Sequence, residues 1–68
     1  MFRKQVISTN IYSVGYMDGT LEVEFLSGGI YQYENVPYRH YINMISYSHP
    51  GTYFERNVKN HYRYRKIA

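Results

Sequence analysis

The first half of the chain alternates hydrophobic and polar residues with the period of two that β-strands show. Residues 21–25 read Leu-Glu-Val-Glu-Phe, which predicts a half-buried antiparallel strand whose glutamates point to solvent or along an edge. Residues 11–16 and 30–34 predict the strands before and after it. Gly15 interrupts the first of these strands and marks either a bulge or a close approach of another backbone.

Glycine-containing turns join the three predicted strands. Asp18-Gly19 between alternating runs is a strong short hairpin signal, and Ser27-Gly28-Gly29 makes the second turn. A tight hairpin requires positive φ, so we expect at least one of Gly28 and Gly29 to adopt it. Three short strands joined in this way predict an antiparallel meander.

The period changes to that of a helix after residue 36. Hydrophobic side chains recur three and four residues apart over residues 37–47, and the proline at the start of this run suits the first turn of a helix. A His-Pro-Gly segment ends this helix. The second helix starts either at Pro50, as its first residue, or at Thr52, whose spacing to Glu55 fits a capping box. It continues to about Asn60.

These elements predict one α+β domain over residues 1–68. Two amphipathic helices cover one face of a three-stranded antiparallel sheet, in the order β-β-β-α-α. Residues 62–67 alternate aromatic and basic side chains, which fits a short fourth strand or an extended tail. Residues 1–7 and 63–68 are interpreted as flexible ends.

Composition indicates how so small a domain is stabilised. The chain has 68 residues, of which ten are Tyr and three are Phe, and these rings supply much of the apolar area available for a core. It has no Cys, which excludes disulfides and thiolate metal sites. Its start lacks the apolar segment of a signal peptide, and no run approaches the roughly 20 apolar residues of a membrane span. We therefore expect a cytoplasmic protein without a membrane partner.

Positive charge is concentrated near the C-terminus. Residues 1–55 carry three basic and five acidic side chains, whereas residues 56–68 carry five basic and no acidic ones. Such an asymmetry indicates an anionic partner, for which nucleic acid is the usual candidate. The basic residues of this segment are Arg56, Lys59, Arg63, Arg65 and Lys66.

Several short motifs, in order and spacing, resemble those of the KTSC domain, a small domain named for the C-terminus of some lysyl-tRNA synthetases and also found as a free-standing protein. The resemblance implies a domain type and RNA binding. Where the family tends to show Ala-x-Ser-x-Gly before the second helix, this chain has Tyr-Ser-His-Pro-Gly, so no role for that serine is carried over. The matching residues are Ser8, Ile11, Gly15-Tyr16, Leu21–Phe25, Gly28 or Gly29, Tyr31-x-Tyr33, Val36-Pro37, Tyr41, Gly51-x-Tyr53-Phe54, Val58-Lys59 and Tyr62.

Two groups of residues are candidates for binding nucleic acid. Tyr31 and Tyr33 form a neighbouring aromatic pair of the kind that stacks on bases, but the polar residues beside them favour a place in the core. The C-terminal basic group is the better candidate, because Tyr64 is interleaved with arginines that contact phosphate while tyrosine stacks on a base. The predicted binding residues are Arg56, Lys59, Arg63, Tyr64, Arg65 and Lys66.

No pattern of catalytic residues accompanies this group. His40, His49 and His61 lack metal-ligand spacing, which favours structural or surface roles. No nucleophile motif or phosphate-binding loop is present, so the sequence predicts neither an enzyme nor a cofactor. The leading hypothesis is a non-catalytic module that binds nucleic acid, RNA in particular. The alternative is a protein-interaction adaptor that uses a strand edge or a tyrosine-rich surface.

Overall fold

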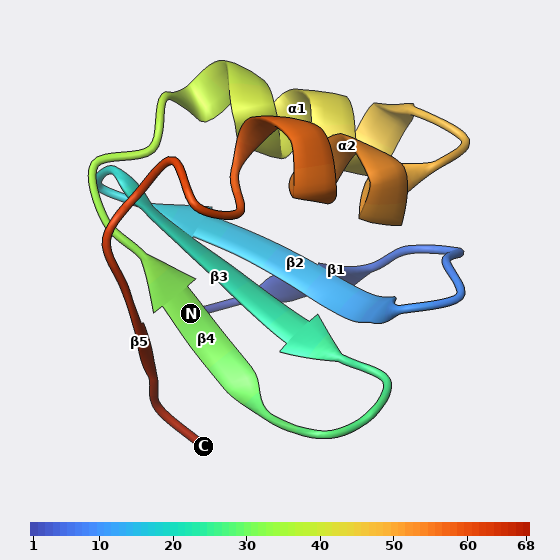
Figure 1. Ribbon diagram of the computed structural model, residues 1–68, viewed down its shortest axis with the longest axis horizontal. Coiled ribbons are helices and arrows are strands. Elements are labelled where there is room, and N and C mark those ends of the chain that lie inside the picture. The colour runs from blue at the N-terminus through green and yellow to red at the C-terminus, as the bar shows by residue number, and fades with distance from the viewer.

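All strands of the protein join in one antiparallel sheet, in the order in which they occur along the chain. The computed structural model describes all 68 residues. Both helices lie on one face of this sheet, and the opposite face carries no helix (Figure 1). The α+β class predicted from the sequence is confirmed. The elements are β1 (Arg3–Gln5), β2 (Ile11–Met17), β3 (Thr20–Phe25), β4 (Ile30–Tyr33), α1 (Tyr38–Ser46), α2 (Pro50–Asn57) and β5 (Tyr64–Lys66).

The sheet has five strands, two more than the meander predicted from the sequence. β1 has the sequence Arg-Lys-Gln, which lacks any hydrophobic alternation, and it pairs with β2 so that Arg3 lies opposite Gly15. β5 returns from the helices and pairs with β4, with Tyr64 opposite Tyr33. The strand alternative for the C-terminal segment is therefore the one that the structure contains.

Gly15 allows β1 to lie close to β2. A Cβ atom at this position would come 2.5 Å from the backbone oxygen of Phe2, a distance that only glycine avoids. Of the two roles predicted for Gly15, close approach is thus correct, because the register shift of β2 lies between Ile11 and Ser13 instead. This irregularity leaves Tyr12 exposed between two buried neighbours.

Both predicted turns have the expected backbone geometry. Asp18 and Gly19 have φ values of 48° and 83°, as a two-residue hairpin turn with two positive φ angles requires. Gly28 and Gly29 have φ values of 98° and 94°, which confirms the expectation for the second turn. Residues other than glycine are strained at such positive φ angles.

A proline lies next to the start of α1 and at the start of α2. Pro37 is the residue before α1 rather than inside it, and Pro50 is the first residue of α2, so the Pro50 alternative is correct. The capping box predicted at Thr52 is absent, because His49 occupies the capping position without a side-chain hydrogen bond. α2 also ends at Asn57, three residues earlier than predicted, and Asn60 beyond it adopts φ of 67°.

The hydrophobic core lies between the helices and the covered face of the sheet. Tyr33 belongs to it, as the sequence predicted, whereas Tyr31 is only partly buried and packs against its margin. Tyr16 closes one end, because its hydroxyl donates to the backbone oxygen of Val36 over 2.6 Å. The nine core residues are Ile11, Val14, Leu21, Val23, Tyr33, Val36, Met44, Phe54 and Val58.

Candidate nucleic-acid interface

The pairing of β4 with β5 divides the predicted binding residues between the two faces of the sheet. Tyr64 and Lys66 lie opposite Tyr33 and Tyr31, so they share the helix-covered face. Arg65 alternates to the other face, where its Nη2 donates to Gln32 Oε1 over 3.2 Å. A sequence pattern of period two implies this split only once the segment is known to be a strand.

Two further predicted residues are not part of β5. Arg56 borders a shallow depression at the junction of α1 and α2, together with His49 and Tyr53. Arg63 precedes β5, and its backbone oxygen accepts a hydrogen bond from the Glu34 amide over 2.8 Å. The six predicted residues thus do not form one continuous patch around a single site.

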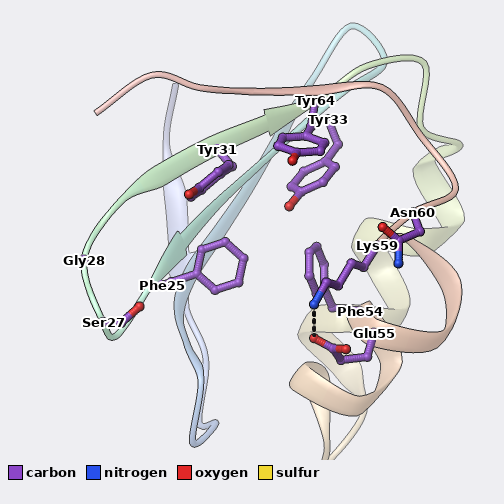
Figure 2. Close-up of a pocket in the computed structure, with 10 residues that line it drawn as sticks. All are labelled: Phe25, Ser27, Gly28, Tyr31, Tyr33, Phe54, Glu55, Lys59, Asn60 and Tyr64. Carbon is purple, nitrogen blue, oxygen red and sulfur yellow. Dashed lines mark ion pairs between the residues drawn. The ribbon is translucent and has the colours of Figure 1, made fainter.

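The structure brings Lys59 and Tyr64 together at a pocket that the sequence did not predict. This pocket has a volume of about 300 Å³ and lies between α2 and the end of the sheet formed by β3, β4 and β5. Figure 2 shows its aromatic side chains turned toward a common space, with Lys59 and Glu55 on the helix side. The lining residues are Phe25, Ser27, Gly28, Tyr31, Tyr33, Phe54, Glu55, Lys59, Asn60 and Tyr64.

Five aromatic rings form a closed circuit of contacts around this pocket. Centroid distances are 5.5 Å for Phe25–Tyr31, 5.9 Å for Tyr31–Tyr64 and 5.5 Å for Tyr64–Tyr33. The circuit closes through Tyr33–Phe54 at 5.3 Å and Phe54–Phe25 at 5.5 Å. Three of these contacts are edge-to-face, a favourable arrangement of ring quadrupoles, so the rings support one another. We call the pocket that these five rings help to line the aromatic pocket.

The Tyr33 hydroxyl has no hydrogen-bond partner in the protein although its residue is only 5% exposed. Every fully enclosed polar side-chain atom has a partner, so this hydroxyl must retain access to the pocket space. Burial, assisted by the neighbouring Tyr64 and Tyr31, raises the pKa of Tyr33 to about 12. The group is therefore a neutral hydroxyl, able to donate to a molecule in the pocket.

One lysine, Lys59, lines the aromatic pocket, and a second, Lys66, lies beside the neighbouring Gly29. Lys59 Nζ is 3.5 Å from Glu55 Oε2, in an ion pair between successive turns of the chain that leaves both groups half-exposed. Lys66 follows Tyr64 on the same face, and its Cε would lie 3.5 Å from a Cβ built on Gly29. The side chain of Lys66 thus extends along the turn at the sheet end of the pocket. Tyr64 itself is 57% exposed.

The opposite face of the sheet carries a polar network instead of exposed carboxylates. The sequence placed Glu22 at solvent or an edge, but Glu22 is only 4% exposed. It forms an ion pair with Arg3 and accepts a hydrogen bond from Gln32 Nε2 over 2.8 Å. Arg3 also reaches Glu24 Oε1 at 3.1 Å. β1, whose existence the sequence did not predict, supplies the arginine that makes this burial tolerable.

These contacts set the charge state of Glu22. Burial by itself opposes ionisation of the carboxyl, but the hydrogen bonds from Gln32 and Arg3 outweigh it and hold the pKa of Glu22 below its ordinary value. The hydrogen bond to Glu22 likewise raises the pKa of Arg3. The Glu22 carboxylate is thus held by Arg3 and Gln32 within the sheet.

His40 has a structural place between the helices. Asn43 Nδ2 donates to the Tyr53 hydroxyl over 2.8 Å, and this hydroxyl is hydrogen-bonded to His40 Nδ1, 2.7 Å away. Burial, followed by the charges of Arg39 and His61, lowers the pKa of His40. No group of three or more His, Asp or Glu side chains is placed to hold a metal ion.

Neither helix is long and apolar enough to cross a membrane.

The family model described as the KTSC domain matches residues 7–62. The fold is similar to that of a KTSC domain protein from Yersinia pestis whose crystal structure is known, with a TM-score of 0.90 and 37% sequence identity. That similarity covers 98% of this chain and 97% of the other. No curated protein matches the chain.

Proposed function

The chain belongs to the KTSC domain family. We propose that it is a small non-catalytic module that binds single-stranded RNA at the sheet edge formed by β5. The observation that carries this proposal is the position of Tyr64. Its ring is exposed, lines the aromatic pocket together with Lys59, and lies on the same face of the sheet as Lys66. A stackable ring flanked by cations is the combination that holds single-stranded nucleic acid in many proteins.

Within this proposal, Lys59 and Lys66 contact phosphates on either side of the base that stacks on Tyr64. Arg63 extends the positive charge along the same segment of chain. Arg65 and Arg56 lie elsewhere, and they contribute to the long-range field that attracts a polyanion rather than to contacts at Tyr64.

Salt dependence of RNA binding tests the proposal. Replacing Lys59 and Lys66 together by Gln removes two candidate phosphate contacts from exposed positions. The slope of log affinity against log salt should then become shallower by up to about 1.4, since each contact to a single strand contributes about 0.7. Anisotropy titrations of a labelled single-stranded RNA at four salt concentrations provide the measurement.

A charge-matched control distinguishes a local site from a general attraction. Lys4 and Arg39 are exposed cations on β1 and α1, away from the pocket. Replacing both by Gln removes the same charge but should leave the slope within error of wild type. Equal slopes for the two double variants, or no binding by wild type, would contradict the proposed interface.

The hypothesis of a protein-interaction adaptor has separate support at the opposite edge of the sheet. β1 is an edge strand, and the residues flanking it include two strongly exposed apolar side chains, Phe2 at 83% and Ile7 at 94%. An apolar, edge-centred partner contact should persist at 0.5 M salt, where phosphate contacts weaken strongly. Partner capture at low and high salt, with Phe2→Ser and Ile7→Ser as variants, tests this second function.

A further inference from the structure

We propose that the aromatic pocket holds one unstacked nucleobase of a bound single-stranded RNA and that the Tyr33 hydroxyl donates a hydrogen bond to it. This inference rests on the proposed function and adds a base-binding subsite to it. The surface contacts proposed above hold the RNA backbone and one base that stacks on Tyr64. The aromatic pocket encloses a second base.

The chemistry of Tyr33 is the first reason. Packing of the Tyr33 ring needs no hydroxyl, and this hydroxyl has no hydrogen-bond partner in the protein, so it is free to bind a molecule in the pocket. The Tyr33 ring packs in the core, while its hydroxyl points into the pocket that the other four rings help to line (Figure 2). Because the hydroxyl remains neutral, it donates to an acceptor, and every nucleobase carries acceptors on its edge.

The size and the walls of the pocket are the second reason. A volume of about 300 Å³ lies at the lower end of the range for small-molecule sites, roughly 300–1,000 Å³, so the pocket suits one base and not a longer segment. The aromatic faces that line the pocket include those of Tyr64, which is exposed, and Tyr31, which is partly buried, and their centroids are 5.9 Å apart. RNA-binding modules commonly hold splayed bases on such faces.

Charge distinguishes a nucleotide from an organic cation, the other ligand that an aromatic pocket suits. Glu55 is the one acidic residue of the lining, and Lys59 already neutralises it at 3.5 Å. Lys66 adds positive charge at the turn. The surroundings therefore favour a base that carries phosphate over a quaternary ammonium group.

The test uses Tyr33→Phe, which removes only the unpartnered hydroxyl and should leave the melting temperature equal or higher. Labelled single-stranded RNA decamers of A, C and U, and an abasic decamer of the same length, are titrated against both proteins. We expect wild type to bind at least one base-containing decamer more tightly than the abasic one. Tyr33→Phe should weaken that binding about two- to tenfold, the range for one neutral hydrogen bond, and leave abasic binding unchanged. Tyr12→Phe, on an exposed ring outside the pocket, is the matched control and should bind as wild type does.

The outcomes separate this inference from the proposed function. If base-containing and abasic decamers bind equally well while the salt slope persists, the base subsite is overturned and the RNA interface stands. If wild type binds no decamer, both are overturned. NMR of the tyrosine rings adds a direct readout. Shifts of Tyr33 and Tyr64 signals with uridine or adenosine monophosphate support the subsite, whereas shifts with tetramethylammonium alone would make the pocket a cation site and overturn it.

Discussion

Arg3 and Glu22 form an ion pair across the open face of the sheet although their strands, β1 and β3, are not neighbours. Gly15 of β2 lies between them and is paired in register with both. Because Gly15 has no side chain, the arginine can extend over β2 and reach the carboxylate. The same row continues through Gln32, which bonds both Glu22 and Arg65, so the polar row has one position on each strand.

Gly15→Ala should therefore detach β1 from the sheet. The added Cβ would be 2.5 Å from the Phe2 backbone oxygen and 3.0 Å from Arg3 Cγ, and a backbone atom cannot move away without breaking the pairing. We expect a loss of about 1–3 kcal/mol in the free energy of unfolding, typical of overpacking. Urea denaturation measures it, with Met17→Ala on the exposed end of the same strand as the control. An unchanged urea midpoint would show that β1 contributes little to stability.

Glu22 should make the stability fall in acid. Its pKa is lower in the folded protein than the ordinary value of 4.5, so its contribution is complete above that pH. The contribution is lost as the pH falls through the lowered folded-state pKa, because only the unfolded chain then binds the proton readily. Urea midpoints measured from pH 7 to pH 3 should decline less for Glu22→Gln than for wild type. Glu34→Gln, on an exposed residue, should follow the wild-type curve.

Protonation of His40 should cause a second loss of stability, at a less acidic pH than the loss caused by Glu22. Its pKa is below the ordinary 6.5 when folded, so protonation favours the unfolded chain. The free energy of unfolding should decrease as the pH falls from 6.5 toward the folded-state pKa and be unaffected above 6.5. An NMR titration of the imidazole signals checks the pKa directly, and His40→Gln should remove the decrease. A His40 midpoint at or above 6.5 would contradict the effect of burial on its pKa.

Tyr33 separates the structural and binding roles of one side chain. Tyr33→Ala deletes a buried ring that contacts both Phe54 and Tyr64, and it should cost about 3–5 kcal/mol, enough to unfold so small a domain. Tyr33→Phe retains these contacts and should unfold at the wild-type temperature or above. Thermal melts followed by circular dichroism give both values. Near-native melting of Tyr33→Ala would show that this ring is not part of the core.

The C-terminal charge was readable from the sequence, but its arrangement was not. Counting residues is enough to find five cations and no acid after Glu55. The directions in which these side chains point depend on β5, because successive residues of a strand, such as Arg65 and Lys66, point to opposite faces of the sheet. The aromatic pocket likewise joins residues from β3, β4, α2 and β5, and no local pattern reports such distant neighbours.

The sequence by itself determined the elements whose signals are local. Alternation, a Pro-initiated helical period and glycine turns with positive φ located β2 to β4 and both helices, because each depends on residues a few positions apart. Only the tertiary structure decided the rest. β1 is held by pairing with β2 and by the Arg3–Glu22 ion pair, which join residues far apart in the chain. The burial of Glu22 depends on β1, and the pocket at Tyr33 depends on the pairing of β5 with β4, and neither long-range contact is indicated by the residues of the terminal segments themselves.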